Sequence, residues 1–287
     1  MSATASTIAA RTASPHWQQR CQIVAGRKIS YRECGSGPAV VLLHGIGSGA
    51  GSWQLLSTLL TQRLRVIAWD APGYGDSDGL AEPEPKASDY ADALRGLVDA
   101  LGLHRFVLVG HSLGAMMAAA FAAACPQHVH VLLLADPAQG YANASAAARA
   151  RACVERVQLL VSLGPEKYAL QRAPGLLRPH PAAEALSAVQ DAMRRLRPAG
   201  FEQACAMLAH DDIWRYLSKW SGTTRVISGD VDTITPPADV SALALRLKAP
   251  LRLLPGAGHA SYLDAPASFA KAVLEAARNL PLAKGMP

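Results

Sequence analysis

The sequence lacks a long hydrophobic run and has few aromatic residues. Aromatic side chains make up 6% of its 287 residues, although hydrophobic residues of all kinds make up 50%. A membrane-spanning helix needs about 20 consecutive apolar residues, and no stretch approaches that length. This composition is typical of a soluble globular protein and predicts no membrane association.

The cysteines are too scattered for a zinc site or a secreted disulfide framework. There are five, an odd number, at positions 21, 34, 125, 153 and 205. Both kinds of site need paired or dense cysteines, so we expect free thiols in a cytoplasmic compartment. Most of them should be buried as small hydrophobic side chains.

Acidic residues are absent from the first part of the chain, up to Glu33. Residues 1–20 are rich in Ala, Ser and Thr and lack the apolar segment of a secretory signal. An acid-free segment with arginine is also found in organellar transit peptides, but we interpret residues 1–20 as a disordered polar tail. The net charge is +6, yet no run of Lys and Arg alternates with aromatic residues, which argues against nucleic-acid binding.

Short apolar runs alternate with longer helical patterns along most of the chain. The runs predict strands at 22–24, 28–33, 39–43, 65–69, 106–109, 129–134, 224–227 and 251–254. Helices are predicted at 52–61, 87–101, 113–124, 238–247 and 266–280. This alternation predicts an α/β fold with a mostly parallel central sheet and helices on both faces.

The alternation is interrupted once, between about residues 138 and 219, where helical patterns are broken by several prolines. We therefore predict one domain with an inserted segment. Residues 21–137 and 220–287 should form the core, and residues 138–219 should form a helical cap.

A serine lies between two glycines where a predicted strand meets a predicted helix. The pentapeptide GHSLG at residues 110–114 matches the G-x-S-x-G nucleophile elbow in the structural context that this motif requires. The sharp turn leaves no room for side chains at Gly110 and Gly114 and holds Ser112 in a strained conformation. Its position at a helix N-terminus favours developing negative charge.

With this motif, the sequence resembles the α/β-hydrolase fold superfamily from about residue 29 to residue 280. The segment AVVLLHGIG at 39–47 is similar to the strand and HG-x-G turn of that superfamily, and WDAPGYGDS at 69–77 is similar to its D-x-x-G-x-G-x-S turn. The resemblance implies an oxyanion hole made by the backbone amides of Ile46 and Leu113. It also places His44, Gly45, His111 and Tyr262 near the substrate.

The nucleophile needs a general base, and the neighbouring His111 is unsuitable because adjacent side chains at an elbow point apart. The resemblance implies His259, in the segment LLPGAGHASYLDAP. For the orienting carboxylate, VISGDVDTITP matches the G-x-x-D-x-x-x-P pattern of the superfamily, which implies Asp232. Asp136, at the end of an earlier strand, and Asp230 remain alternatives in that order.

A competing motif overlaps the same region. GIGSGA at 45–50 satisfies the relaxed dinucleotide fingerprint, and Asp70 ends the next predicted strand. Two observations argue against this interpretation. An apparent hairpin precedes the strand, and nicotinamide binding would give no role to the segments that resemble the α/β-hydrolase motifs.

These motifs predict a hydrolase with a Ser-His-Asp triad that needs no metal and no organic cofactor. The implied substrate is a small carboxylic ester, lactone or thioester, as for serine esterases and lactonases. Residues 144–200 hold nine Lys or Arg and four Asp or Glu, a bias that permits an anionic substrate but equally fits a solvated helix surface.

Two alternatives stay open. A C–C bond hydrolase of ring-cleavage diketones shares the fold and triad, but such relatives usually carry Asn and Trp where this sequence has His111 and Ala260. A non-catalytic receptor for small molecules can also use this fold. Nothing in the sequence predicts the oligomeric state.

Overall fold

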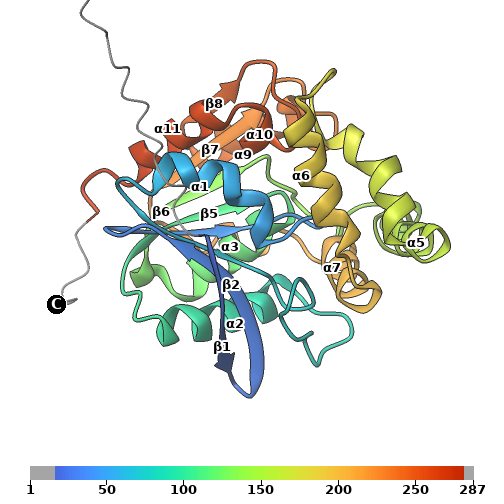
Figure 1. Cartoon of the computed structure of the whole chain (residues 1–287), viewed down its shortest axis with the longest axis horizontal. Coiled ribbons are helices and arrows are strands. Elements are labelled where there is room, and N and C mark those ends of the chain that lie inside the picture. The colour runs from blue at the N-terminus through green and yellow to red at the C-terminus, as the bar shows by residue number, and fades with distance from the viewer. Residues whose placement is uncertain (1–16, 281–287) are drawn as a thin grey trace, which may run out of the picture.

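A central eight-stranded sheet organises the chain in the computed structural model, which describes residues 17–280 (Figure 1). The strand order is β1-β2-β4-β3-β5-β6-β7-β8. The strands are β1 (Gln18–Val24), β2 (Arg27–Cys34), β3 (Ala39–Leu43), β4 (Arg65–Trp69), β5 (Phe106–His111), β6 (Val129–Ala135), β7 (Thr224–Gly229) and β8 (Leu251–Leu254).

The sheet is antiparallel at one edge and parallel elsewhere. β1 pairs with β2 and β2 with β4 in antiparallel register, whereas every pairing from β4 to β8 is parallel. Because β3 and β5 are buried along their whole length, their sequences are nearly continuous apolar runs instead of alternating ones. This confirms the predicted α/β fold.

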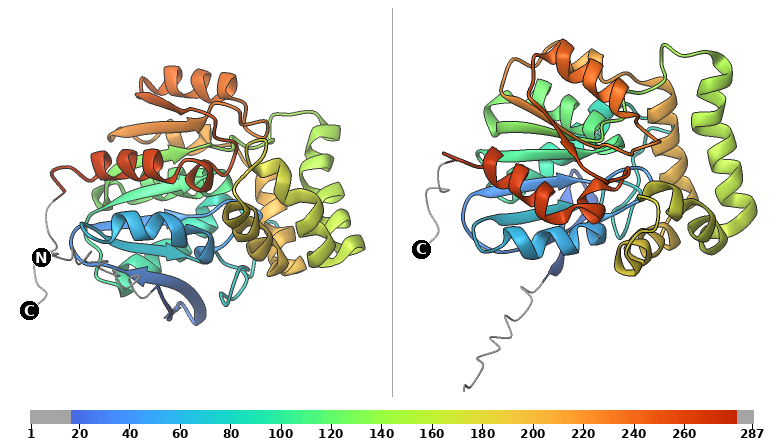
Figure 2. Two further views of the ribbon diagram at one scale, coloured as in Figure 1. Left: turned by 45° about the horizontal axis from the view of Figure 1, so that its top comes forward. Right: turned by 90° about the horizontal axis from the view of Figure 1, so that it is seen from above.

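Helices cover both faces of the sheet (Figure 2). The core helices are α1 (Gln54–Leu60), α2 (Ala87–Ala100), α3 (Leu113–Ala124), α9 (Pro237–Leu247), α10 (Ser261–Asp264) and α11 (Pro266–Ala276). α1 and α11 pack together on one face, while α2 and α3 pack together on the other. The parallel strands therefore all end at the same edge of a sheet that is shielded from both sides.

The segment between β6 and β7 is helical and stands beside the sheet (Figures 1 and 2). It contains α4 (Ala146–Ala150), a π-helical turn (Arg151–Glu155), α5 (Arg156–Arg172), α6 (Ala183–Arg194), α7 (Pro198–His210) and α8 (Trp214–Leu217). α5 leaves helical geometry at Gly164, where φ is 69°, directly before Pro165. These helices occupy the region predicted as an insertion.

Some predicted boundaries were wrong. β1 begins at Gln18, so the end of the predicted 1–20 tail pairs with β2, and residues 1–16 lie outside the described residues. The helix predicted at 52–61 is a 3-10 turn (Ala50–Trp53) followed by α1, and the helix predicted at 266–280 ends at Ala276. α10 was not predicted.

Two global properties can be read from the described residues. Over residues 17–280, no helix combines the length and apolar character needed to cross a bilayer. All five cysteines are free, and three of them are buried.

Candidate active site

Ser112 lies at a sharp turn between β5 and α3. Its backbone angles are φ 53° and ψ −119°, which a residue with a side chain adopts only at a cost in energy. A Cβ atom at Gly110 would lie 2.4 Å from the carbonyl oxygen of Gly114, and one at Gly114 would lie 2.4 Å from that of Leu43. Glycine is therefore required at both positions, as the motif predicts, and the turn raises the hydroxyl above the sheet.

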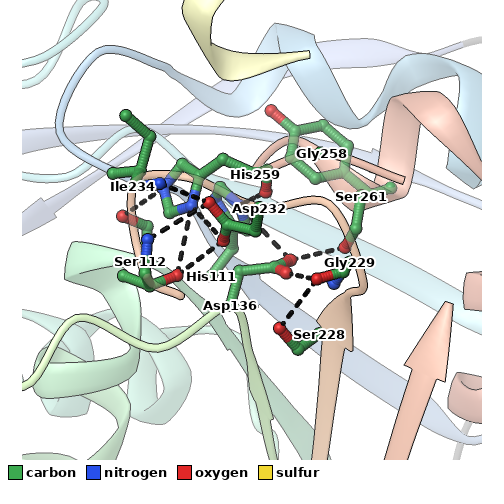
Figure 3. A network of polar contacts seen from close by, with 12 residues as sticks. His111, Ser112, Asp136, Ser228, Gly229, Asp232, Ile234, Gly258, His259 and Ser261 are labelled. Atoms are coloured by element: carbon green, nitrogen blue, oxygen red, sulfur yellow. Dashed lines mark hydrogen bonds and ion pairs between the residues drawn. The ribbon is translucent and has the colours of Figure 1, made fainter. Parts of the chain in front are cut away.

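Ser112, His259 and Asp232 form one continuous chain of hydrogen bonds (Figure 3). The imidazole Nε2 lies 2.9 Å from the Ser112 hydroxyl, and Nδ1 lies 2.8 Å from Asp232 Oδ2. In the tautomer that satisfies both contacts, Nδ1–H donates to the carboxylate and Nε2 accepts from the hydroxyl. The three residues follow β5, β7 and β8, so the common edge of the sheet brings them together.

The carboxylate of Asp232 accepts several hydrogen bonds. The amides of Ile234 and Thr235 donate to Oδ1 at 2.7 and 3.1 Å, and the Thr235 hydroxyl donates to Oδ2 at 2.6 Å. Burial alone would raise the pKa of Asp232, but the contacts with His259 and these donors outweigh it and lower the pKa. The group is thus held as an anion beside the imidazole.

Asp136, the first alternative to Asp232, makes different contacts. Its carboxylate accepts hydrogen bonds from the Gly229 amide at 2.7 Å and the Ser261 hydroxyl at 2.5 Å, but none from the imidazole of His259 (Figure 3). Burial raises the pKa of Asp136 to about 7. Asp136 therefore joins the end of β7 to the segment after His259, whereas Asp232 is the carboxylate that contacts the imidazole of His259.

Asp230, the second alternative, closes a turn, as its carboxylate accepts from the Gly256 amide at 2.6 Å.

His111 is buried beside the hydrogen-bonded chain. Its Nε2 lies 2.8 Å from the carbonyl oxygen of His259, and its ring contacts the ring of Tyr262 edge-on with centroids 4.9 Å apart. Burial and the neighbouring His259 lower the pKa of His111 to about 3, so the ring is neutral. Its Nε2–H donates to the backbone carbonyl oxygen of His259, and no contact joins the His111 ring to the Ser112 hydroxyl among the described residues.

A cavity of about 250 Å³ opens at Ser112 and His259. Core residues Gly45, Ile46, Leu113 and Tyr262 line it, together with residues of the inserted helices. Within residues 17–280 no acceptor is found for the amide of Ile46 or Leu113, the two donors expected in the oxyanion hole. Both amides are thus available to a bound oxygen.

His44 does not line this cavity, contrary to the expectation that it contacts substrate. Its Nδ1 lies 2.8 Å from the carbonyl oxygen of Gly45, and its Nε2 accepts from the Ala71 amide at 3.0 Å. Because both ring nitrogens are used within the protein, His44 supports the turn that carries Ile46.

Asp70, the acidic residue of the competing dinucleotide motif, is also used internally. Its carboxylate accepts from the Ala50 amide and from the Ser30 hydroxyl, both at 2.8 Å. A carboxylate committed to these two donors is not presented to a ribose, which removes the main support for dinucleotide binding.

Sequence reasoning missed Thr235 and Ser261. Thr235 could have been found, because an Asp side chain often accepts from the backbone amide two residues on, as Asp232 does from Ile234, and such a turn brings the next residue close to the carboxylate. Ser261 contacts Asp136 across a separation of 125 residues, and no local pattern signals such a pair. Among the described residues, no group of three or more His, Cys, Asp and Glu side chains could hold a metal ion.

The chain belongs to the alpha/beta hydrolase family, whose sequence profile matches residues 40–272. It is 39% identical over 113 residues to a 2-hydroxy-6-oxo-6-phenylhexa-2,4-dienoate hydrolase from Comamonas testosteroni, which covers 38% of this chain and 40% of that protein. The aligned segments span only 32% to 42% of the length of such curated relatives.

Solved structures agree with the fold over nearly the whole chain. A thermophilic esterase from Thermogutta terrifontis is 25% identical, with a TM-score of 0.79, and covers 92% of this chain and 99% of its own. An enol-lactonase from Burkholderia xenovorans is 22% identical, with a TM-score of 0.77, and covers 90% and 99%.

Proposed function

We propose that this protein is a serine hydrolase that cleaves a small carboxylic ester, lactone or thioester through an acyl-enzyme intermediate. The observation that carries the proposal is the unbroken chain from Ser112 through His259 to Asp232 beside a cavity with two unpaired amides. A nucleophile, its base, an orienting carboxylate and oxyanion donors are the parts that acyl transfer requires.

In the first half of the reaction, His259 Nε2 takes the proton of the Ser112 hydroxyl as Oγ forms a bond to the substrate carbonyl carbon. The carbonyl π electrons move to oxygen, and the amides of Ile46 and Leu113 donate to this oxyanion. Each donor is expected to contribute about 3 kcal/mol to the transition state. When the intermediate collapses, the bond to the leaving group breaks and that group takes the proton from His259.

In the second half, His259 removes a proton from water, whose oxygen attacks the acyl carbon. The carboxylic acid leaves as Ser112 Oγ recovers a proton from the imidazole. Asp232 stays ionised throughout and stabilises the imidazolium, in keeping with its lowered pKa. We further propose that residues 138–219 form a cap that selects the substrate, because they supply part of the cavity wall.

Turnover of p-nitrophenyl acetate and butyrate tests the proposal. The wild-type protein should release p-nitrophenol and should be labelled once by a fluorophosphonate, as measured by intact-protein mass spectrometry. Ser112→Ala should lose both. A folded wild-type protein that hydrolyses no ester, lactone or thioester and resists labelling contradicts the proposal and favours a non-catalytic receptor.

C–C bond hydrolysis is the second candidate, because the chain shares 39% identity over 113 residues with a 2-hydroxy-6-oxo-6-phenylhexa-2,4-dienoate hydrolase. His111 and Ala260 replace the Asn and Trp usual in such relatives, which argues against it. Loss of absorbance from that dienoate, measured beside the ester assay, distinguishes the two. A kcat/KM for the dienoate at least tenfold above that for every ester would favour this candidate.

A further inference from the structure

Two arginines of the inserted helices line the same cavity as Ser112. Arg156 begins α5 and Arg172 ends it, 17 residues in all. A straight helix of this length would separate its ends by about 24 Å. The break at Gly164, where φ is 69°, redirects the chain, and both ends reach one cavity of about 250 Å³. The break at Gly164 therefore brings two positively charged side chains to the same cavity.

The positive charges of Arg156 and Arg172 both affect the pKa of the Tyr168 phenol. Tyr168, on the second half of α5, is 4% exposed. Burial raises the pKa of its phenol, while the positive charges of Arg156 and Arg172 oppose that rise. The two charges are thus close enough to the same side chain to influence it together.

Neither arginine has an ion pair with any residue in the described part of the chain. By contrast, Arg194 on the neighbouring α6 pairs with both Glu166 and Asp191. Asp239 is the one acidic side chain that lines the cavity among the described residues. Among the described residues, the lining therefore combines two arginines that have no ion-pair partner with one carboxylate, which leaves an excess of positive charge.

We propose that Arg156 and Arg172 bind a free carboxylate of the substrate, so that the protein prefers esters or lactones that carry a second, ionised acid group. The planar guanidinium matches a carboxylate with two parallel hydrogen bonds. A cavity of about 250 Å³ is small for a ligand site, which favours a compact diacid derivative over an acyl group on a large carrier. This inference rests on the proposed function and names its substrate class.

Two pairs of substrates test the inference, each pair differing only in charge. p-Nitrophenyl hydrogen adipate and its methyl ester place the carboxylate on the acyl side, and 4-carboxyphenyl butyrate and its methyl ester place it on the leaving group. Release of the phenol gives kcat/KM for each, after subtraction of the uncatalysed rate. The wild-type protein should prefer the anionic member of at least one pair, and added salt should reduce that preference.

Arg156→Gln and Arg172→Gln should each lower kcat/KM for the anionic substrate about tenfold more than for its neutral ester. The matched control is Arg151→Gln, an exposed arginine that does not line the cavity. It should retain the wild-type preference. Equal losses on anionic and neutral substrates, or no preference in either wild-type pair, would overturn the inference while leaving ester hydrolysis intact.

If no hydrolysis is observed, a binding measurement tests the carboxylate site separately from the proposed hydrolase activity. Isothermal titration of monoethyl adipate into Ser112→Ala should show weaker affinity, by about tenfold, when Arg156 or Arg172 is also replaced by Gln. Unchanged affinity overturns the carboxylate site. Absence of hydrolysis in the wild-type protein overturns only the proposed function.

Discussion

His111 donates a hydrogen bond from Nε2 to the backbone carbonyl oxygen of His259, at 2.8 Å. The residue before Ser112 in sequence thus holds the main chain of His259, which comes 148 positions later. The ring is 4% exposed and lies between the elbow and the segment that begins α10. The position of the His259 imidazole therefore depends on His111, although the His111 ring does not contact the Ser112 hydroxyl.

His111→Ala should lower both stability and turnover. The change leaves the buried carbonyl oxygen of His259 without its donor, which costs about 1 to 3 kcal/mol in the free energy of unfolding. A less well held imidazole should also lower kcat more than it changes KM. Urea unfolding and ester kinetics measure the two effects. His104→Ala, at an exposed histidine, should change neither, and an unaltered kcat in His111→Ala would contradict the positioning role.

Asp232→Asn and Asp136→Asn should differ strongly in activity. Asn at 232 cannot stabilise the imidazolium, so kcat should fall by about 10⁴. Asn at 136 leaves the His259 to Asp232 contact in place, so kcat should stay within about tenfold of wild type although the Ser261 contact weakens. Steady-state kinetics on p-nitrophenyl butyrate compare the two. The reverse ranking would identify Asp136 as the orienting acid.

Thr235→Val should slow the reaction through Asp232. The Thr235 hydroxyl donates to Oδ2 of Asp232, the oxygen that also accepts from His259. Without this donor the pKa of Asp232 should rise, and kcat should fall about tenfold. Because the anionic form of Asp232 is then lost at higher pH, the acidic limb of the pH profile should move upward. Thr235→Ser should restore the wild-type profile, and a Val variant with an unshifted profile would refute this role.

The pH dependence of stability should show the effect of Asp136. Its pKa rises from 3.8 to about 7 in the folded protein, so the folded state binds more protons than the unfolded state between these values. Stability contributed by this group is therefore present below about pH 4 and lost as the pH rises toward 7. The loss amounts to about 4 kcal/mol for three pKa units.

Urea unfolding of the wild type and Asp136→Asn at several pH values between 4 and 8 measures this loss. The difference in unfolding free energy between the two should shift in favour of the Asn variant as the pH rises. A difference that is constant over this range would show that Asp136 ionises normally.

Ser112→Gly should be more stable than Ser112→Ala. The positive φ of 53° at Ser112 strains any residue with a Cβ, and glycine relieves this strain. After the entropy cost of glycine in the unfolded chain, a gain of about 1 kcal/mol over Ala is expected. Thermal unfolding of both inactive variants tests this, and Ala at least as stable as Gly would mean that the elbow carries no strain.

The sequence was most informative where a function needs a local backbone shape. The glycines around Ser112 are dictated by contacts below 3 Å, so the elbow could be recognised from five residues. The parallel strands were visible because burial on both faces makes each one a continuous apolar run. Asp232 and His259 could be predicted only from the resemblance, because no local sequence pattern shows that their side chains lie within hydrogen-bond distance.

Contacts between distant residues could not be predicted. His44 matched a motif beside the oxyanion donors, but its ring bonds to Gly45 and Ala71 only after β3 and β4 lie side by side. The strand predicted at 22–24 is shorter than β1 because the polar residues from Gln18 onward do not alternate clearly. Pairing with β2 extends the strand to Gln18. The approach of Arg156 and Arg172 likewise depends on the direction of the chain after Gly164.

The order of the sheet has a consequence for biosynthesis. The hydroxyl of Ser112 and the two amides beside it belong to the first half of the chain, whereas the imidazole arrives after β8. A nascent polypeptide that has left the ribosome only as far as β6 would carry Ser112 without the imidazole that contacts its hydroxyl. The three side chains of the proposed site should therefore come together only after β8 has emerged and paired with β7.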